Sequence, residues 1–160
     1  MTAAVQSSFH LAAGGPADLP DVMRIMSSAF PPTFGEGWSK SQCAGILPLG
    51  GVRLVVARTA DGEPAGFSLD RRVVDEAELL LLAVGSGFQR QGLGTLLLRE
   101  FIETHRGGDV ARLHLEVRDG NPAVTIYEQF GFRAVGRRKD YYRGADGVFN
   151  DAVTMIRELE

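Results

Sequence analysis

The chain has 160 residues, enough for one folded domain with a sizeable core, and we expect residues 1–160 to form a single domain. Its 44% hydrophobic and 23% charged residues are ordinary for a globular protein, and its net charge of −3 argues against a protein that coats nucleic acid. The lone cysteine, Cys43, excludes a disulfide framework, and the lack of a secretory signal or an apolar run of ~20 residues predicts a cytoplasmic protein without a membrane helix.

The first half of the sequence alternates between strand and helix patterns. Gly14-Gly15-Pro16 separates a short strand from a helix for which Asp18 is the expected N-cap, and Pro31-Pro32 ends that helix. Ser39 is the expected cap of a second, short helix. Three apolar runs follow, divided by turn signals such as Asp61-Gly62. The elements expected here are a strand at 9–12, helices at 18–30 and 39–46, and strands at 53–58, 64–73 and 76–84.

The second half begins with a helical period and ends with strand patterns. Leu93, Leu97 and Phe101 belong to the apolar stripe of a helix that Gly107-Gly108 ends. The elements expected here are a helix at 93–104, a strand at 112–117, a helix at 122–129 and two long antiparallel strands at 132–142 and 148–157. This order predicts a mixed α/β sheet with a strand–helix–strand unit in its middle.

The segment Gln89-Arg90-Gln91-Gly92-Leu93-Gly94 is the most informative motif. It follows the apolar run Leu79 to Val84 and opens the amphipathic helix. The first turn of a helix has unpaired N–H groups and a partial positive charge, and glycines allow the backbone to approach a phosphate closely. The segment therefore predicts an anion-binding turn, in which Arg90 either adds charge or is an ordinary solvated arginine.

This turn and three further motifs resemble those of the GNAT superfamily of acyl-CoA-dependent N-acetyltransferases, over nearly the whole chain. The chain is most similar to the RimI-type ribosomal-protein-alanine N-acetyltransferases. The three motifs are Leu115-Glu116-Val117-Arg118, Tyr127-Glu128-x-x-Gly131-Phe132 and Arg137-Arg138-x-x-Tyr141-Tyr142. The resemblance implies an α/β (α+β) GNAT fold, with a mixed, mostly antiparallel central sheet of six to seven strands flanked by about four helices.

The resemblance also implies acetyl-CoA as cosubstrate. In the family, the backbone of the strand before the turn pairs with the pantetheine arm, and the amides of the turn hold the pyrophosphate. Family members usually have an asparagine seven residues before the helix tyrosine, whereas Asn121 lies six before Tyr127. The loop Pro31 to Gly37 is longer than expected and lies where the acceptor would bind. The expected cofactor residues are Leu82, Ala83, Val84, Gln89, Arg90, Gln91, Gly92, Leu93, Gly94, Thr95 and Asn121.

Acetyl transfer from a thioester to an amine needs a neutral amine, a polarised carbonyl and a protonated or stabilised thiolate. Glu116, on the polar side of its strand, is the candidate general base, as the matching glutamate is in RimI-type enzymes. Tyr127 is the candidate general acid, because a phenol with a pKa of ~10 can donate a proton to a thiolate. The simpler interpretations are a surface carboxylate for Glu116 and a packed aromatic ring for Tyr127.

The leading hypothesis is a transferase that acetylates a protein N-terminal α-amine, such as the N-terminal alanine of a small-subunit ribosomal protein. Two alternatives stay open: an acetyltransferase for a small-molecule amine, and a non-catalytic acyl-CoA-binding module. We expect no nucleic acid or membrane partner, despite the basic cluster Arg137, Arg138 and Lys139, and either a monomer or a homodimer. The three histidines are scattered, so no metal site is expected.

Overall fold

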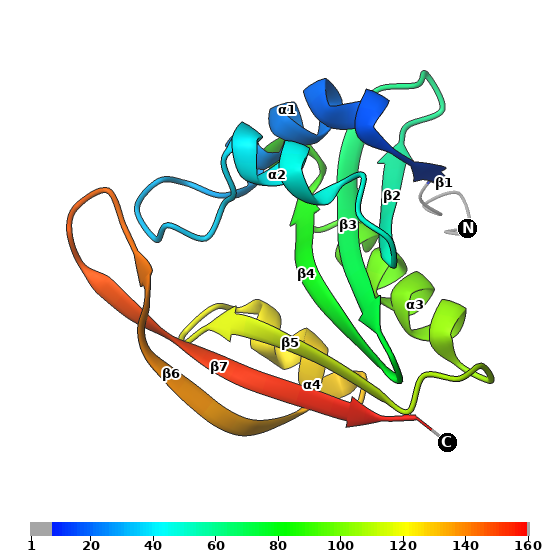
Figure 1. The fold of residues 1–160 in the computed structure, drawn as a ribbon. Coiled ribbons are helices and arrows are strands. Elements are labelled where there is room, and N and C mark those ends of the chain that lie inside the picture. Colours follow the sequence, from blue (N-terminus) through cyan, green and yellow to red (C-terminus); the bar gives the residue numbers. More distant parts are fainter. Residues whose placement is uncertain (1–7, 160) are drawn as a thin grey trace, which may run out of the picture.

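The computed structural model describes residues 8–159, which form a seven-stranded sheet with the strand order β1-β2-β3-β4-β5-β7-β6 (Figure 1). The sheet and its helices confirm the predicted fold class. The strands are β1 (His10–Gly14), β2 (Val52–Arg58), β3 (Pro64–Val73), β4 (Glu76–Val84), β5 (Arg112–Arg118), β6 (Arg133–Arg143) and β7 (Phe149–Glu158).

The sheet separates in its middle, where β4 and β5 form its parallel pair. Their pairing runs only from Glu76 opposite Arg112 to Leu79 opposite Leu115, and beyond it both strands continue without each other. A bulge in the β3–β4 pairing between Leu69 and Asp70 bends β4 at this point. Figure 1 shows the two strands diverging like the arms of a V. The inner edge of each arm is therefore left open to a ligand.

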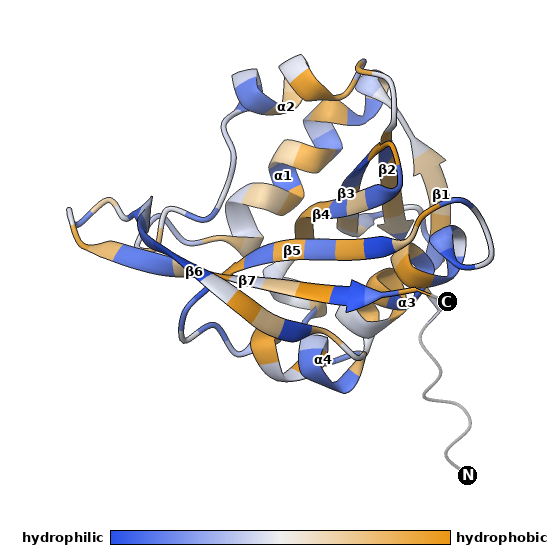
Figure 2. Cartoon of the chain, turned by 60° about the horizontal axis from the view of Figure 1, so that its bottom comes forward, coloured by the Kyte–Doolittle hydropathy of each residue, from blue (hydrophilic) through white to orange (hydrophobic). Residues whose placement is uncertain are grey.

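Four helices cover the two faces of the sheet. Helices α1 (Leu19–Ala29) and α2 (Lys40–Ile46) pack with β2, β3 and β4 in one apolar cluster. Helices α3 (Leu93–His105) and α4 (Ala123–Gln129) pack on the opposite face. Figure 2 shows polar and apolar residues alternating along α1, as expected for a helix with one buried side.

The N-termini of helices α1 and α2 are capped in different ways. Ser39 caps α2 as predicted, in a reciprocal capping box with Gln42. Asp18 is the N-cap residue of α1 as predicted, although its side chain makes no capping hydrogen bond to that helix. A short 3₁₀ turn (Pro16–Asp18) precedes α1 and directs the carboxylate back to the Gly15 N–H, at 2.9 Å, and to Arg58, at 3.3 Å.

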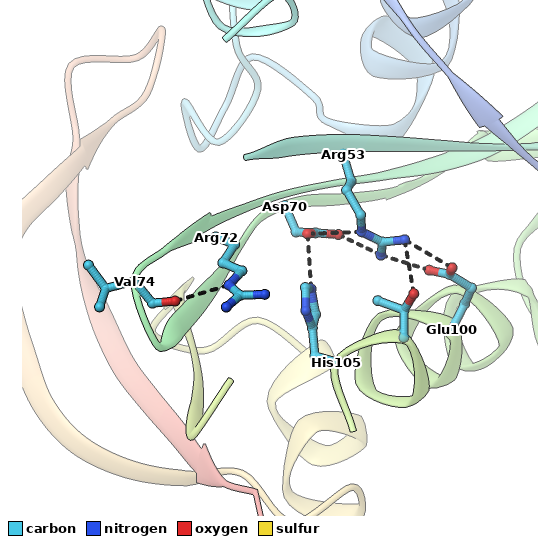
Figure 3. A network of polar contacts seen from close by, with 7 residues as sticks. Arg53, Asp70, Arg72, Val74, Glu100 and His105 are labelled. Atoms are coloured by element: carbon cyan, nitrogen blue, oxygen red, sulfur yellow. Dashed lines mark hydrogen bonds and ion pairs between the residues drawn. The ribbon is translucent and has the colours of Figure 1, made fainter. Parts of the chain in front are cut away.

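A partly buried polar cluster joins α3 to strands β2 and β3 (Figure 3). Asp70 is fully buried on β3, accepts two hydrogen bonds from Arg53, and contacts the His105 ring at 3.3 Å. Arg53 also binds Glu100 and Thr104 of α3, with donor–acceptor distances of 3.1–3.3 Å. We call these five residues the α3 network. Asp70 and Glu100 both have cationic partners in it, which is the usual condition for burying charge.

Candidate functional site

A cleft of about 620 Å³ lies between the diverging arms of β4 and β5. It is walled by the segment after α1, by both strands, by the start of α4 and by β6. Both predicted catalytic residues, Glu116 and Tyr127, line this cleft. The expected cofactor residues that line it are Leu82, Ala83, Val84, Gln89, Arg90, Gly94 and Asn121; those that do not are Gln91, Gly92, Leu93 and Thr95.

The predicted anion-binding turn joins one end of the cleft to the start of α3. Arg90 and Gly92 both have positive φ, +64° and +80°, which reverses the chain between β4 and the helix. Gly92 is the N-cap of α3, and no side chain caps the helix there. The N–H groups of its first turn thus lack intrahelical partners, as anion binding requires. Leu93 itself is buried in the core beneath the turn, so its side chain serves packing.

The inner edge of β4 continues from this turn into the cleft. Residues 81–84 pair with β3 on their outer side, whereas β5 has already diverged on the inner side. Among the described residues, the one side-chain contact to the backbone here is from Gln89, whose amide lies 3.4 Å from the Val84 carbonyl. An open strand edge can bind an extended ligand that carries amides, because its backbone groups are free to pair.

Glu116 lies on β5, opposite this open edge, and is held from two sides. Its carboxylate accepts a hydrogen bond from the Thr154 hydroxyl and pairs with the Arg138 guanidinium. The Glu116 side chain is only 11% exposed, although its partner Arg138 is 62% exposed, so the carboxylate is mostly buried and also forms the ion pair that the simpler interpretation expected. These two contacts orient the carboxylate toward the cleft wall formed by the β6–β7 hairpin.

Tyr127 projects from α4 and is 7% exposed. Its ring packs edge-on against Phe132, with centroids 6.0 Å apart. Burial raises the pKa of the Tyr127 phenol well above its ordinary value, and the negative charge of Glu36 adds to the rise. The phenol is therefore protonated at neutral pH, as a proton donor must be. The packing interpretation holds as well, because the ring is buried while the residue lines the cleft.

Glu36 is a site residue that the sequence analysis did not single out. It comes from the long loop after α1 and is 11% exposed. Arg118 donates to one of its oxygens at 3.1 Å and Asn121 to the other at 2.8 Å. The Arg118 guanidinium also stacks on Phe34, 3.7 Å from the ring centroid. The unusual loop length was the available signal, but a loop carboxylate ordinarily indicates a solvated surface.

Asn121 has both of its side-chain polar groups engaged within the chain. Its amide nitrogen binds Glu36, and its carbonyl oxygen accepts the Ala123 N–H at 2.8 Å, at the start of α4. It lines the cleft, but these bonds tie the loop to α4. A cofactor contact from Asn121 stays a prediction.

The far end of the cleft is closed by the β6–β7 hairpin. The Ala145 N–H donates to the Pro32 carbonyl at 2.9 Å, which joins the hairpin to the long loop. Tyr142 donates to the Glu116 carbonyl at 3.4 Å. In the basic cluster of β6, Arg137 pairs with Asp119 and Asp151 while Arg138 pairs with Glu116. We call Glu36, Arg118, Asn121, Glu116 and Arg138 the acceptor wall.

Two negative findings apply to residues 8–159. No group of three or more histidine, cysteine, aspartate or glutamate side chains in this range is arranged to hold a metal ion. No helix in the same range is both long enough and apolar enough to cross a membrane.

Comparison with known proteins relates the whole architecture to one family. A model of the acetyltransferase (GNAT) domain matches residues 32–145. The [ribosomal protein bS18]-alanine N-acetyltransferase of Salmonella typhimurium is 38% identical over 141 residues, 86% of this chain and 89% of that protein. The protein of the same name from Escherichia coli is 42% identical over 98 residues, which are 61% of this chain and 66%, just under two thirds, of that protein.

Solved structures agree with this placement. The crystal structure of the ribosomal-protein-S18-alanine N-acetyltransferase from Escherichia coli superposes with a TM-score of 0.85 at 32% identity, covering 95% of this chain and 94% of that one. Arabidopsis thaliana NAA60, at 19% identity and a TM-score of 0.80 over 95% of this chain and 98% of that one, shares the fold. The diverging strands, the glycine turn and the family match over most of the sequence lead to one conclusion: this chain belongs to the GNAT acetyltransferase family.

Proposed function

We propose that the protein transfers the acetyl group of acetyl-CoA to a protein N-terminal α-amine, and that the acceptor is the N-terminal alanine of ribosomal protein bS18. The relatives that carry this activity in their names support the acceptor. The observation that carries the reaction is the presence of Glu116 and Tyr127 in one cleft, between an open strand edge and a closed acceptor wall. Such an acceptor would place the enzyme in the cytoplasm. We propose that the enzyme acts as a monomer or a homodimer.

The residues present fit acetyl-CoA. The uncapped first turn of α3, with the backbone of residues 89–95, would hold the pyrophosphate. The open edge of β4 at 82–84 would pair with the amides of the pantetheine arm. Arg90 lines the same end of the cleft and would add positive charge. Asn121, just before α4, would also contact the cosubstrate if its hydrogen bond to Glu36 were broken. The cosubstrate supplies the activated acetyl group.

Glu116 and Tyr127 would each carry out one of the proton transfers in the reaction. Glu116 would take a proton from the acceptor nitrogen, held for this by Thr154 and Arg138. Tyr127 would donate a proton to the departing sulfur, because a phenol with an ordinary pKa of about 10 is protonated at neutral pH and the residue lines the cleft. An α-amine has an ordinary pKa of about 7.7–8.0, whereas a lysine side chain has one of about 10.4. A weaker base is therefore enough to deprotonate an α-amine than to deprotonate a lysine.

One observation favours the second acceptor class, a small-molecule amine. The Glu36 loop and the β6–β7 hairpin meet across the end of the cleft, through the Ala145–Pro32 hydrogen bond and the close approach of Gly144 to the Thr33 carbonyl. Neighbouring residues of both segments, Phe34 of the loop and Tyr142 of the hairpin, line the cleft. A small amine would enter without moving either segment.

The test is mass spectrometry of a peptide that carries the alanine-starting N-terminus of bS18, incubated with the protein and acetyl-CoA. The matched control is the same peptide with a blocked α-amine. Acetylation of the free peptide alone supports the proposal. No peptide product, with acetylation of a polyamine or amino acid, would move the assignment to the small-amine class. Coenzyme A binding without thiol release from any acceptor would identify a non-catalytic binding module.

A further inference from the structure

Both carboxylate oxygens of Glu116 already have partners in this structure. One oxygen accepts the Thr154 hydroxyl, and the other forms an ion pair with the Arg138 guanidinium. Thr154 is on β7, directly opposite Glu116 in the register, whereas Arg138 is on β6, one strand further away. An acceptor's ammonium group that approaches Glu116 therefore meets a cation that is already in contact with the carboxylate.

The sheet leaves a path for the Arg138 side chain across β7. Arg138 lies opposite Ala152 of β7. Gly136, two residues earlier on the same face of β6, lies opposite Thr154. The positions between the guanidinium and the carboxylate are therefore occupied by small residues. Within residues 8–159, Arg138 is the one arginine or lysine that forms an ion pair with Glu116.

Arg138 is held less firmly than the carboxylate that it contacts. Its side chain is 62% exposed, whereas that of Glu116 is 11% exposed. Its guanidinium also lies 5.7 Å from the ring centroid of Tyr141, an exposed residue that lines the cleft. An ion pair with a solvent-exposed member is weak, and a cation over an aromatic ring retains a favourable contact without a carboxylate. Arg138 can therefore leave Glu116 and remain over Tyr141.

The charges at the acceptor end of the cleft favour an incoming cation. Glu36, Glu78 and Glu116 line this end. Arg118 pairs with Glu36, and Arg138 pairs with Glu116. Within residues 8–159, Glu78 has neither a side-chain hydrogen bond nor an ion pair. An ammonium group can therefore take the place of the Arg138 guanidinium without leaving a mostly buried carboxylate unpaired.

We propose that Arg138 is a specificity-determining residue that the acceptor displaces. Its guanidinium holds the Glu116 carboxylate until the acceptor binds, and the acceptor's ammonium group then takes its position while Arg138 moves toward Tyr141. Thr154 keeps its hydrogen bond, so the carboxylate stays oriented during the exchange. The exchange selects acceptors that arrive as cations, because a neutral group cannot replace the lost ion pair. This inference rests on the proposed function, in which Glu116 receives the acceptor nitrogen.

The test is steady-state kinetics of Arg138→Gln, with the acceptor that the wild-type protein acetylates as the varied substrate. A contact that must break before a ligand binds lowers the apparent affinity for that ligand. Removing the guanidinium should therefore raise kcat/KM for the acceptor by about fivefold, the upper end for an ion pair with an exposed member. The whole gain should come from a lower acceptor KM, and the KM of acetyl-CoA should not follow it.

Arg137→Gln is the matched control, because it removes the same charge from the neighbouring position of β6. Arg137 pairs with Asp119 and Asp151, neither of which lines the cleft, so its acceptor KM should stay at the wild-type value. Arg138→Lys keeps a cation and should restore much of the wild-type KM. Melting temperatures check that each variant folds. Calorimetric titration of the acceptor in the presence of coenzyme A should show the same gain in affinity for Arg138→Gln without turnover.

The possible results separate this inference from the proposed function. A higher acceptor KM in Arg138→Gln, or a lower kcat at unchanged KM, would overturn the inference, because Arg138 would then bind the acceptor or hold the base throughout the reaction. An unchanged KM, or an equal fall in Arg137→Gln, would also overturn it. Any of these results with an active wild type overturns this inference alone. A wild type that acetylates no amine overturns the proposed function, and this inference with it.

Discussion

Two clusters of charged residues in this protein use the same chemical groups for different ends. The α3 network and the acceptor wall each combine arginines with carboxylates. In the α3 network the central carboxylate of Asp70 is fully buried, and three contacts from Arg53 and His105 satisfy it. The acceptor wall instead borders an open cleft, next to Glu78, which has no hydrogen-bond or ion-pair partner among the described residues.

The difference shows how burial and partner number separate a structural cluster from a chemical one. In the α3 network the buried carboxylate of Asp70 is paired, and Arg53 and Glu100, which are about one third exposed, are paired with each other, so the cluster joins helix to sheet. Where a carboxylate has no hydrogen-bond or ion-pair partner, as at Glu78, it is free to bind a cation or to accept a proton. The following predictions test this division, in order of decreasing expected effect.

Tyr127→Phe should lower kcat by about 10³-fold while leaving the melting temperature nearly unchanged, because it removes the proposed proton donor and keeps the packed ring. Tyr142→Phe provides the comparison, since Tyr142 is also largely buried and burial also raises its pKa above the ordinary value. Single-turnover kinetics on both variants would measure the chemical step. Equal losses in the two variants would contradict the special role of Tyr127.

Asp70→Asn should lower the free energy of unfolding by about 3 kcal/mol, because Arg53 loses a charged partner in a buried position. Urea denaturation measures this change. Activity per folded molecule should stay at the wild-type level, since none of the α3 network lines the cleft. Glu158→Gln breaks the exposed Arg112–Glu158 pair and should cost less than about 1 kcal/mol. A large activity loss in folded Asp70→Asn would contradict the view that the α3 network has a structural role only.

Glu36→Gln should raise the acceptor KM by about tenfold and leave acetyl-CoA binding unchanged. The substitution weakens the charge-assisted bonds from Arg118 and Asn121, worth about 1.5–3 kcal/mol each, that hold the long loop against the cleft. Steady-state kinetics with each substrate varied in turn separates the two effects. A change in acetyl-CoA affinity alone would instead indicate that Glu36 acts on the binding of acetyl-CoA and not on that of the acceptor.

Cys43→Ala should cost about 1 kcal/mol of stability and leave transfer intact, because Cys43 is a small apolar group in the α1–α2 core. Burial raises the pKa of its thiol, so the thiolate is scarce at neutral pH. Alkylation of the native protein should therefore be slow at pH 7 and accelerate only well above the ordinary thiol pKa. Fast labelling at pH 7 would contradict this assignment.

Local patterns in the sequence were sufficient to predict most of the helices and strands. The apolar run before Gly92, the helical stripe after it and the alternation around Glu116 each depend on residues that are neighbours along the chain. Strand and helix positions therefore agree with the structure to within a few residues. Glu116 and Tyr127 were singled out from motifs that resemble those of a known family. The structure brings both into one cleft, and their catalytic roles stay a prediction.

The acceptor wall required the folded chain. Glu36 meets Arg118 and Asn121 across more than eighty positions of sequence, and Asp18 turns from its helix toward Arg58 forty positions away. No periodicity reports such contacts, because they depend on where β4 and β5 part and on which loop lies above the gap. Residue types and their spacing determine local backbone geometry, but pairing between distant side chains depends on packing that only the complete sheet and its helices create.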